Sequence, residues 1–131
     1  MKTIITAFTA IMSLLLLTQC KKDNTVFNSY FYTSMDEKDV QLSLYIDKQY
    51  KGELPYLTRK PSACDNDTLK QKALFLALQS GKYTVETKDK QGNIKSSFTL
   101  KIKSNSMQVR SIKGGNETEL CNGCLVAGLY Y

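Results

Sequence analysis

Apolar and polar residues alternate along residues 93–103, and this pattern constrains the fold more than any other feature of the chain. One set of alternate positions is apolar or small, namely Ile94, Ser96, Phe98, Leu100 and Ile102. The other set begins with Asn93 and otherwise holds only lysine, serine and threonine. Because successive side chains of a strand point to opposite faces, the pattern predicts a β-strand with one face on a core and one in water.

A second alternation, in which polar residues flank Tyr83 and Val85, predicts the partner strand of a hairpin. Directly opposed residues of an antiparallel pair share a face, so the numbers of paired residues must here sum to an odd value. A connection of two residues, Gln91-Gly92, or of four, Asp89 to Gly92, meets this condition. A connection of three would meet it only with a bulge.

Shorter apolar runs predict further strands at residues 26–33, 40–46, 49–51 and 107–112. The apolar run 73–78 fits a helix capped by Asp67 or Thr68, or a buried central strand after one helical turn. We favour the strand, because Ser80-Gly81 leads directly into the Tyr83 segment. The sequence thus predicts an all-β fold, a small antiparallel β-sandwich of about six to eight short strands, as a single domain over residues 26–131.

The first twenty residues have the pattern of an export signal. Lys2 is positive, and the uncharged, mostly apolar run 4–17 is shorter than the roughly 20 residues that a membrane-spanning helix requires. The run ends at Leu17-Thr18-Gln19-Cys20, which resembles the lipobox of bacterial lipoproteins, with Gln19 where a small residue is usual. The resemblance implies removal of residues 1–19 as a signal peptide and attachment of lipid to the sulfur of Cys20.

Two or more acyl chains hold a protein stably on a membrane, since each buried methylene contributes about 0.8 kcal/mol. We therefore expect a lipid anchor in the cell envelope, in the outer membrane, with the domain facing the periplasm or the cell surface. Residues 20–25 form the expected flexible tether. Within it, Lys21-Lys22-Asp23-Asn24 resembles an export tag of some surface lipoproteins, and a solvated linker explains it equally well.

Three segments of the domain share a further pattern. Residues 40–47 end in Ile46-Asp47, and the stretches Gly52-Glu53-Leu54-Pro55 and Gly81-Lys82-Tyr83-Thr84-Val85 follow. Together, over about residues 40–103, they resemble the PEGA family of small β-sandwiches in envelope-exposed proteins, from which Lys48, Leu54 and the long segment 59–72 depart. Gly52 and Pro55 are expected to turn the chain out of the sheet. The resemblance implies a surface or scaffolding module without a catalytic centre.

Three cysteines, Cys64, Cys121 and Cys124, remain once Cys20 is assigned to lipid. In an oxidising envelope we expect one disulfide and one free thiol. A bridge from Cys64 to Cys121 or Cys124 closes a long loop worth about 4 kcal/mol, against about 2 kcal/mol for a Cys121–Cys124 ring, so we favour the long bridge. Asn122-Gly123 is a hairpin signal, whereas a redox motif places its first cysteine at a helix start. Reduced thiols, redox activity and a zinc site completed by a carboxylate are the alternatives.

The chain has 18 Lys and Arg against 12 Asp and Glu, a net charge of +6, and no His. Because the lysines are scattered, this charge indicates weak attraction to anionic surfaces rather than nucleic-acid binding. The absence of His removes the commonest general base and metal ligand, and we expect no catalytic residue, metal or cofactor. The acidic residues of two clusters match no calcium loop and are expected in solvated turns; they are Asp36, Glu37, Asp39, Asp65 and Asp67.

The sequence therefore favours a lipid-anchored, non-catalytic β-domain that binds a protein or glycan partner at the envelope or serves there as a structural accessory. Thiol–disulfide exchange through Cys121 and Cys124 is the enzymatic alternative. An inhibitor or immunity lipoprotein is the third. Tyr130 and Tyr131 are expected at the edge of the last strand, with an exposed docking handle as the other interpretation.

Overall fold

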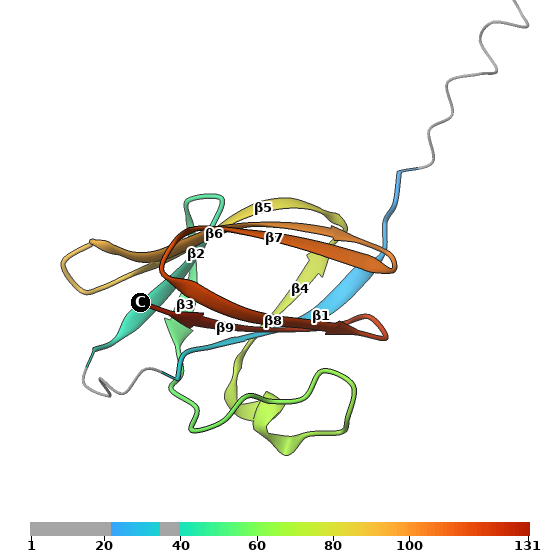
Figure 1. Ribbon diagram of the computed structural model, residues 1–131, viewed down its shortest axis with the longest axis horizontal. Helices are drawn as coiled ribbons and strands as arrows, with labels where there is room; N and C mark the ends of the chain where they lie inside the picture. Colours follow the sequence, from blue (N-terminus) through green and yellow to red (C-terminus); the bar gives the residue numbers. More distant parts are fainter. Residues whose placement is uncertain (1–21, 35–39) are drawn as a thin grey trace, which may run out of the picture.

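Two β-sheets pack face to face (Figure 1), and a computed structural model describes residues 22–34 and 40–131. The four-stranded sheet has the order β4-β1-β9-β8, which are Leu74–Gln79, Val26–Tyr32, Cys124–Tyr130 and Gly115–Cys121. The five-stranded sheet has the order β3-β2-β5-β6-β7, which are Gln49–Leu54, Leu42–Ile46, Gly81–Lys88, Ile94–Lys103 and Ser106–Lys113. The predicted all-β sandwich is confirmed.

The described residues form nine strands rather than six to eight, because β8 and β9 have no alternating pattern. In β9, residues 125–129 are all buried, so the strand contacts protein on both faces and its sequence is continuously apolar or small. The Asn122-Gly123 turn between β8 and β9 is confirmed, with both residues at positive φ.

The sandwich is not wholly antiparallel, because β1 and β9 pair in parallel at the centre of the four-stranded sheet. Tyr30 lies opposite Val126 in this pair, and β4 flanks β1 on its other side. The beginning and the end of the domain thus meet in one ladder. Tyr130 is the last residue of β9, so it lies at the end of the last strand as expected, and that strand is an inner one.

The hairpin of β5 and β6 has the predicted register but neither predicted connection. Val85 lies opposite Phe98, as the odd-sum rule requires, whereas the connection is residues 89–93, an odd number. A bulge after Thr87 compensates for this, so the apolar sets still share a face. The turn is held by the Asp89 carboxylate, which accepts hydrogen bonds from the backbone N–H groups of Gln91 and Asn93.

β4 confirms the strand predicted for residues 73–78, and the 3₁₀ turn η1 (Thr68–Lys72) before it confirms the single helical turn. The expected central position is wrong, because β4 forms the edge of its sheet and buries only Leu78 fully. Gly52 also differs from expectation: it lies inside β3, and the chain leaves the sheet only at Pro55.

The core between the sheets consists of alternate residues from both inner faces. Its largest fully buried side chains are Phe27, Phe31, Phe98, Leu42, Leu44, Leu100, Ile102, Leu125 and Leu129. Two single-residue connections carry the chain from one sheet to the other, Ser80 between β4 and β5 and Gly114 between β7 and β8. These corners join the two sheets directly at both sides of the core.

The chain before β1 is fixed to the sandwich from Asp23 onward. The Asp23 carboxylate accepts hydrogen bonds from the Thr25 hydroxyl at 2.6 Å and from the Ser104 N–H, in the β6–β7 turn, at 2.9 Å. The bonds from Thr25, together with those from Ser80 and Ser104, hold the pKa of Asp23 well below its usual range. The end of the sandwich that carries the β6–β7 turn therefore lies next to the beginning of the described chain at Asp23 (Figure 1).

We predict that Gly114→Ala destabilises the protein by about 3 kcal/mol. Its φ is +68°, and an added Cβ would lie 2.5 Å from the Tyr130 carbonyl oxygen and 2.9 Å from Ser96 Cβ. Gly92→Ala is the matched control, because Gly92 also has positive φ but no atom within 4 Å of an added Cβ, and it should cost about 1 kcal/mol. Urea unfolding measures both, and equal losses would contradict the packing argument.

Candidate functional site

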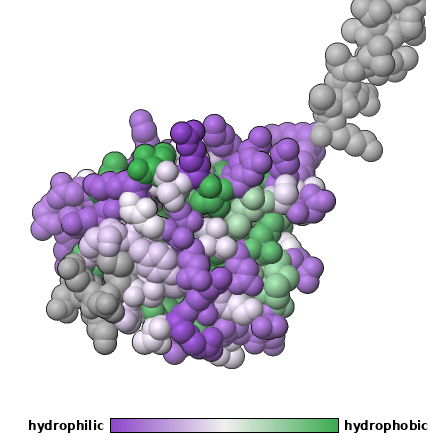
Figure 2. Space-filling view, in the orientation of Figure 1, coloured by the Kyte–Doolittle hydropathy of each residue, from purple (hydrophilic) through white to green (hydrophobic). Residues whose placement is uncertain are grey.

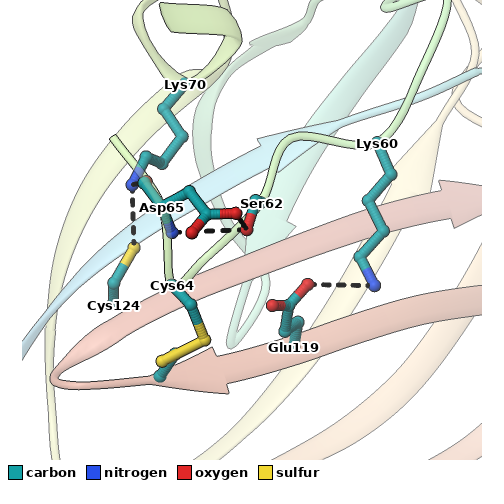
Figure 3. Close-up of a disulfide and its surroundings, with 8 residues drawn as sticks. Lys60, Ser62, Cys64, Asp65, Lys70, Glu119 and Cys124 are labelled. Atoms are coloured by element: carbon teal, nitrogen blue, oxygen red, sulfur yellow. Dashed lines mark hydrogen bonds and ion pairs between the residues drawn. A yellow bond between two sulfur atoms is a disulfide. The ribbon is translucent and has the colours of Figure 1, made fainter. Parts of the chain in front are cut away.

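The outer face of the four-stranded sheet gathers the cysteines predicted from the sequence, and residues 55–73 cover part of it. Cys64, in this covering segment, forms a disulfide with Cys121 at the end of β8 (Figure 3). This confirms the favoured long bridge and leaves Cys124 as a free thiol. Leu57 and Ala63 of the segment pack on Tyr32 and Val126, so a second small core lies outside the sheet.

Asp67 holds the covering segment in its shape. Its carboxylate accepts hydrogen bonds from the N–H groups of Leu69 and Ser62, each at 3.0 Å, and pairs with Arg59 at 3.0 Å. These bonds, that from Leu69 first, lower the pKa of Asp67. Asp67 is therefore the cap of η1 and not a solvated turn residue, whereas Asp65 is exposed as expected.

The Cys124 thiol is half-buried next to Lys70, whose Nζ lies 4.0 Å from Sγ (Figure 3). Burial raises the pKa of this thiol, and the Lys70 charge offsets the effect only in part. Cys121 and Cys124 directly oppose each other across the β8–β9 hairpin without being bonded. The arrangement leaves one thiol that is mainly protonated at neutral pH.

A polar network borders the covered area. The hydroxyls of Tyr32 and Tyr130 lie 3.5 Å apart over Gly128, and Tyr130 donates to Glu117 at 2.9 Å. Burial, and next the Tyr130 hydroxyl, raise the pKa of Tyr32 far above its usual range. An ion pair of 3.1 Å joins Lys60 to Glu119 (Figure 3). The Lys60 ion pair thus attaches the covering segment to β8, and the tyrosine hydroxyls join β1, β9 and β8.

The remainder of the outer face is open and partly apolar. Phe75 of β4 is 51% exposed and Val26 of β1 is 53% exposed. Tyr30, directly opposite Phe75 in the ladder, contacts its ring with the ring centroids 5.4 Å apart. The face drawn in Figure 2 is mostly hydrophilic, with hydrophobic residues in separate patches.

The edge of β4 is the second open feature. The Ser80 N–H donates to the Thr25 carbonyl oxygen at 2.8 Å, so these two residues form a hydrogen-bonded pair. Along an antiparallel ladder, hydrogen-bonded pairs alternate with pairs whose backbone groups point away from the partner strand. Phe75 and Ala77 therefore direct their backbone N–H and C=O groups away from β1. The Gln79 carbonyl also points outward and accepts a bond from the Tyr83 hydroxyl at 2.6 Å. An uncharged segment, Leu-Phe-Leu-Ala-Leu-Gln, thus presents unpaired backbone groups at a sheet edge.

Other predicted features lie elsewhere or outside the described part of the chain. Cys20, the signal segment 1–19 and the acidic residues Asp36, Glu37 and Asp39 are not among the described residues. Within residues 22–34 and 40–131, no three potential metal ligands of the His, Cys, Asp and Glu types come together. The same residues contain no helix long and apolar enough to span a membrane.

No protein-family model, curated protein or solved structure matches this chain. The geometry of the site and the sequence patterns therefore carry the functional argument alone.

We predict that iodoacetamide labels Cys124 and neither Cys64 nor Cys121 in the native protein. Because its pKa is raised, the thiolate forms at higher pH than in an exposed cysteine, so labelling should be slower at pH 8 and should still rise above pH 9. Lys70→Gln removes the nearby positive charge and should slow labelling further. Peptide mapping with a pH series checks this, and rapid labelling at neutral pH would instead favour thiol–disulfide exchange.

Proposed function

We propose that this protein is a lipoprotein of the bacterial cell envelope, anchored in the outer membrane through lipid on Cys20, whose β-sandwich binds a protein partner without catalysis. The observation that carries the binding proposal is the open, uncharged edge of β4 beside exposed Phe75. Membership of the PEGA family is part of the proposal and rests on the sequence pattern of residues 40–103.

The anchor is supported by the lipobox-like sequence at Leu17 to Cys20 and by the short distance from it to the folded domain. Asp23 already contacts the β6–β7 turn, so only a few residues separate the lipid from the sandwich. An extended chain spans at most about 3.6 Å per residue, which places Asp23 within about 11 Å of Cys20. The domain would sit close to the membrane.

A protein partner is favoured over a glycan because the exposed groups are those that a strand recognises. Main-chain N–H and C=O groups at Phe75 and Ala77 can pair with an added strand, and exposed side chains beside them give selectivity. Native sheets normally protect such an edge with charge, proline or a bulge. β4 has no charged residue and no proline. The strand β3 lies near it at the beginning of β4, where Gly52 is close to the Leu74 side chain. An inhibitor or immunity lipoprotein would be one case of such a binding protein, with the toxin or hydrolase that it blocks as the partner.

Thiol–disulfide exchange has less support. Exchange requires an accessible thiolate, whereas Cys124 is half-buried with a raised pKa and its neighbour Cys121 is bonded to Cys64. The Cys64–Cys121 bridge joins the covering segment to β8, as expected of a disulfide that stabilises the fold.

We predict that Cys20→Ala abolishes labelling by fatty acid and releases the protein from membranes into the soluble fraction. Cys124→Ala is the matched control and should keep both the label and the membrane association. Metabolic labelling with membrane fractionation measures both properties. Membrane retention of an unlabelled Cys20→Ala protein would contradict the lipid anchor.

We predict that Ala77→Pro lowers photo-cross-linking of a protein partner from position Phe75 at least about tenfold, because proline lacks the N–H that an added strand needs. The sandwich should remain folded, since the Ala77 N–H points away from β1 and proline is tolerated on edge strands. Ala77→Val keeps the N–H and should keep the cross-link. A cross-linked product that is glycan, or one that Ala77→Pro leaves unchanged, would contradict strand addition at β4.

A further inference from the structure

The outer face of the five-stranded sheet carries a basic hollow that the proposed function does not use. It has a volume of about 300 Å³ and is lined by Lys82, Thr99, Lys101, Gln108, Val109 and Arg110. The residues come from β5, β6 and β7, which form adjacent strands of the sheet. The hollow therefore has a rigid floor, and the side chains of all its lining residues except Val109 can donate hydrogen bonds.

Positive charges are placed against one another in this hollow. Lys82 lies directly opposite Lys101, and Arg110 lies opposite Thr99 two pairs farther along the ladder, on the same face. Like charges directly opposite across strands are destabilising unless an anion lies between them. No carboxylate lines the hollow. The Asp47 carboxylate accepts a bond from the N–H of Thr84, two positions from Lys82. Glu86 is four positions from Lys82, about 13 Å along β5. Among the described residues, the ion pairs of basic side chains involve Arg59, Lys60 and Lys95 instead.

The donors suit a phosphate group. Arg110 can hold two phosphate oxygens with its planar guanidinium, and the two ammonium groups add point charges from the neighbouring strands. The Thr99 hydroxyl and the Gln108 amide lie in the same hollow and can complete the hydrogen bonds of the remaining oxygens. A carboxylate has fewer oxygens and less charge than this donor set can bind.

The position of the hollow indicates the source of the phosphate, and this step rests on the proposed lipid anchor. Lys101 is three positions from Ser104, whose N–H binds Asp23, so it lies about 10 Å along β6 from the point where the tether meets the sandwich. Exposed Lys103 lies between Lys101 and that point on the same face. We infer that the hollow binds the phosphate of an anionic lipid headgroup in the membrane that holds the anchor.

The test uses the intact lipoprotein reconstituted into vesicles of phosphatidylcholine, with or without phosphatidylglycerol. Acetylation of individual lysines, mapped by mass spectrometry, reports contact with lipid. Lys82 and Lys101 should be labelled about fivefold less with phosphatidylglycerol present, the factor typical of a basic side chain at an anionic surface. Lys51 and Lys90, which are exposed and do not line the hollow, should be labelled equally in both vesicles. Arg110→Gln should remove most of the protection.

The outcomes separate this inference from the proposed function. Protein that floats with neither vesicle type would refute the lipid anchor and this inference with it. Protein that floats with both, but whose Lys82 and Lys101 are labelled equally in both, would overturn the inference alone. Protection by added glycerol phosphate in phosphatidylcholine vesicles, as strong as that by phosphatidylglycerol, would assign the hollow to a soluble ligand and contradict a lipid source. Protection that survives Arg110→Gln unchanged would also overturn it.

Discussion

The parallel pairing of β1 with β9 is the interaction on which the rest of this structure depends. It places the first strand of the domain between the last strand and β4, with Phe27 and Phe31 fully buried in the core. The segment that leads toward Cys20, the proposed site of the lipid, is therefore continuous with an inner strand. Because Asp23 binds the β6–β7 turn, the orientation of the sandwich toward the proposed anchor follows from the same pairing. A flexible linker would leave that orientation open.

The two sheets leave two outer faces with different properties. On the four-stranded sheet, the Cys64–Cys121 bridge holds residues 55–73 over the Tyr32 side of the face and leaves Phe75 with the edge of β4 uncovered. On the five-stranded sheet, the outward side chains around the hollow are polar or basic, whereas Tyr50 and Ile112 are exposed elsewhere on its strands. One face thus offers apolar surface with unpaired backbone groups, and the other offers positive charge. The two proposals assign these faces to a protein strand and to lipid phosphate.

Local sequence patterns predicted the strands that have one buried face. They did not predict the strands and turns whose structure depends on tertiary contacts. The alternation in β6 and the odd-sum rule gave the correct strand and register, and loop entropy favoured the bridge that forms. The strand β9 was not predicted, because burial of both its faces removes the alternation of apolar and polar residues. Its parallel pairing with β1 was not predicted either, because it joins residues that are far apart in the sequence. The turn at residues 89–93 depends on Asp89 and a compensating bulge. The pairing of charges in the basic hollow could have been predicted, because the register that pairs Val85 with Phe98 also pairs Lys82 with Lys101.

The orientation of the membrane-bound domain tests the account most directly. A nitroxide attached through Asn105→Cys, in the β6–β7 turn, or through Gln91→Cys, in the β5–β6 turn, reports depth by paramagnetic relaxation in a Cys124→Ala background. The account predicts that the label at position 105 lies at the headgroups and the label at position 91 lies farther into water, by less than the roughly 30 Å length of β6, because the basic hollow on the same strand also reaches the headgroups. Equal depths, or a deeper label at position 91, would contradict it.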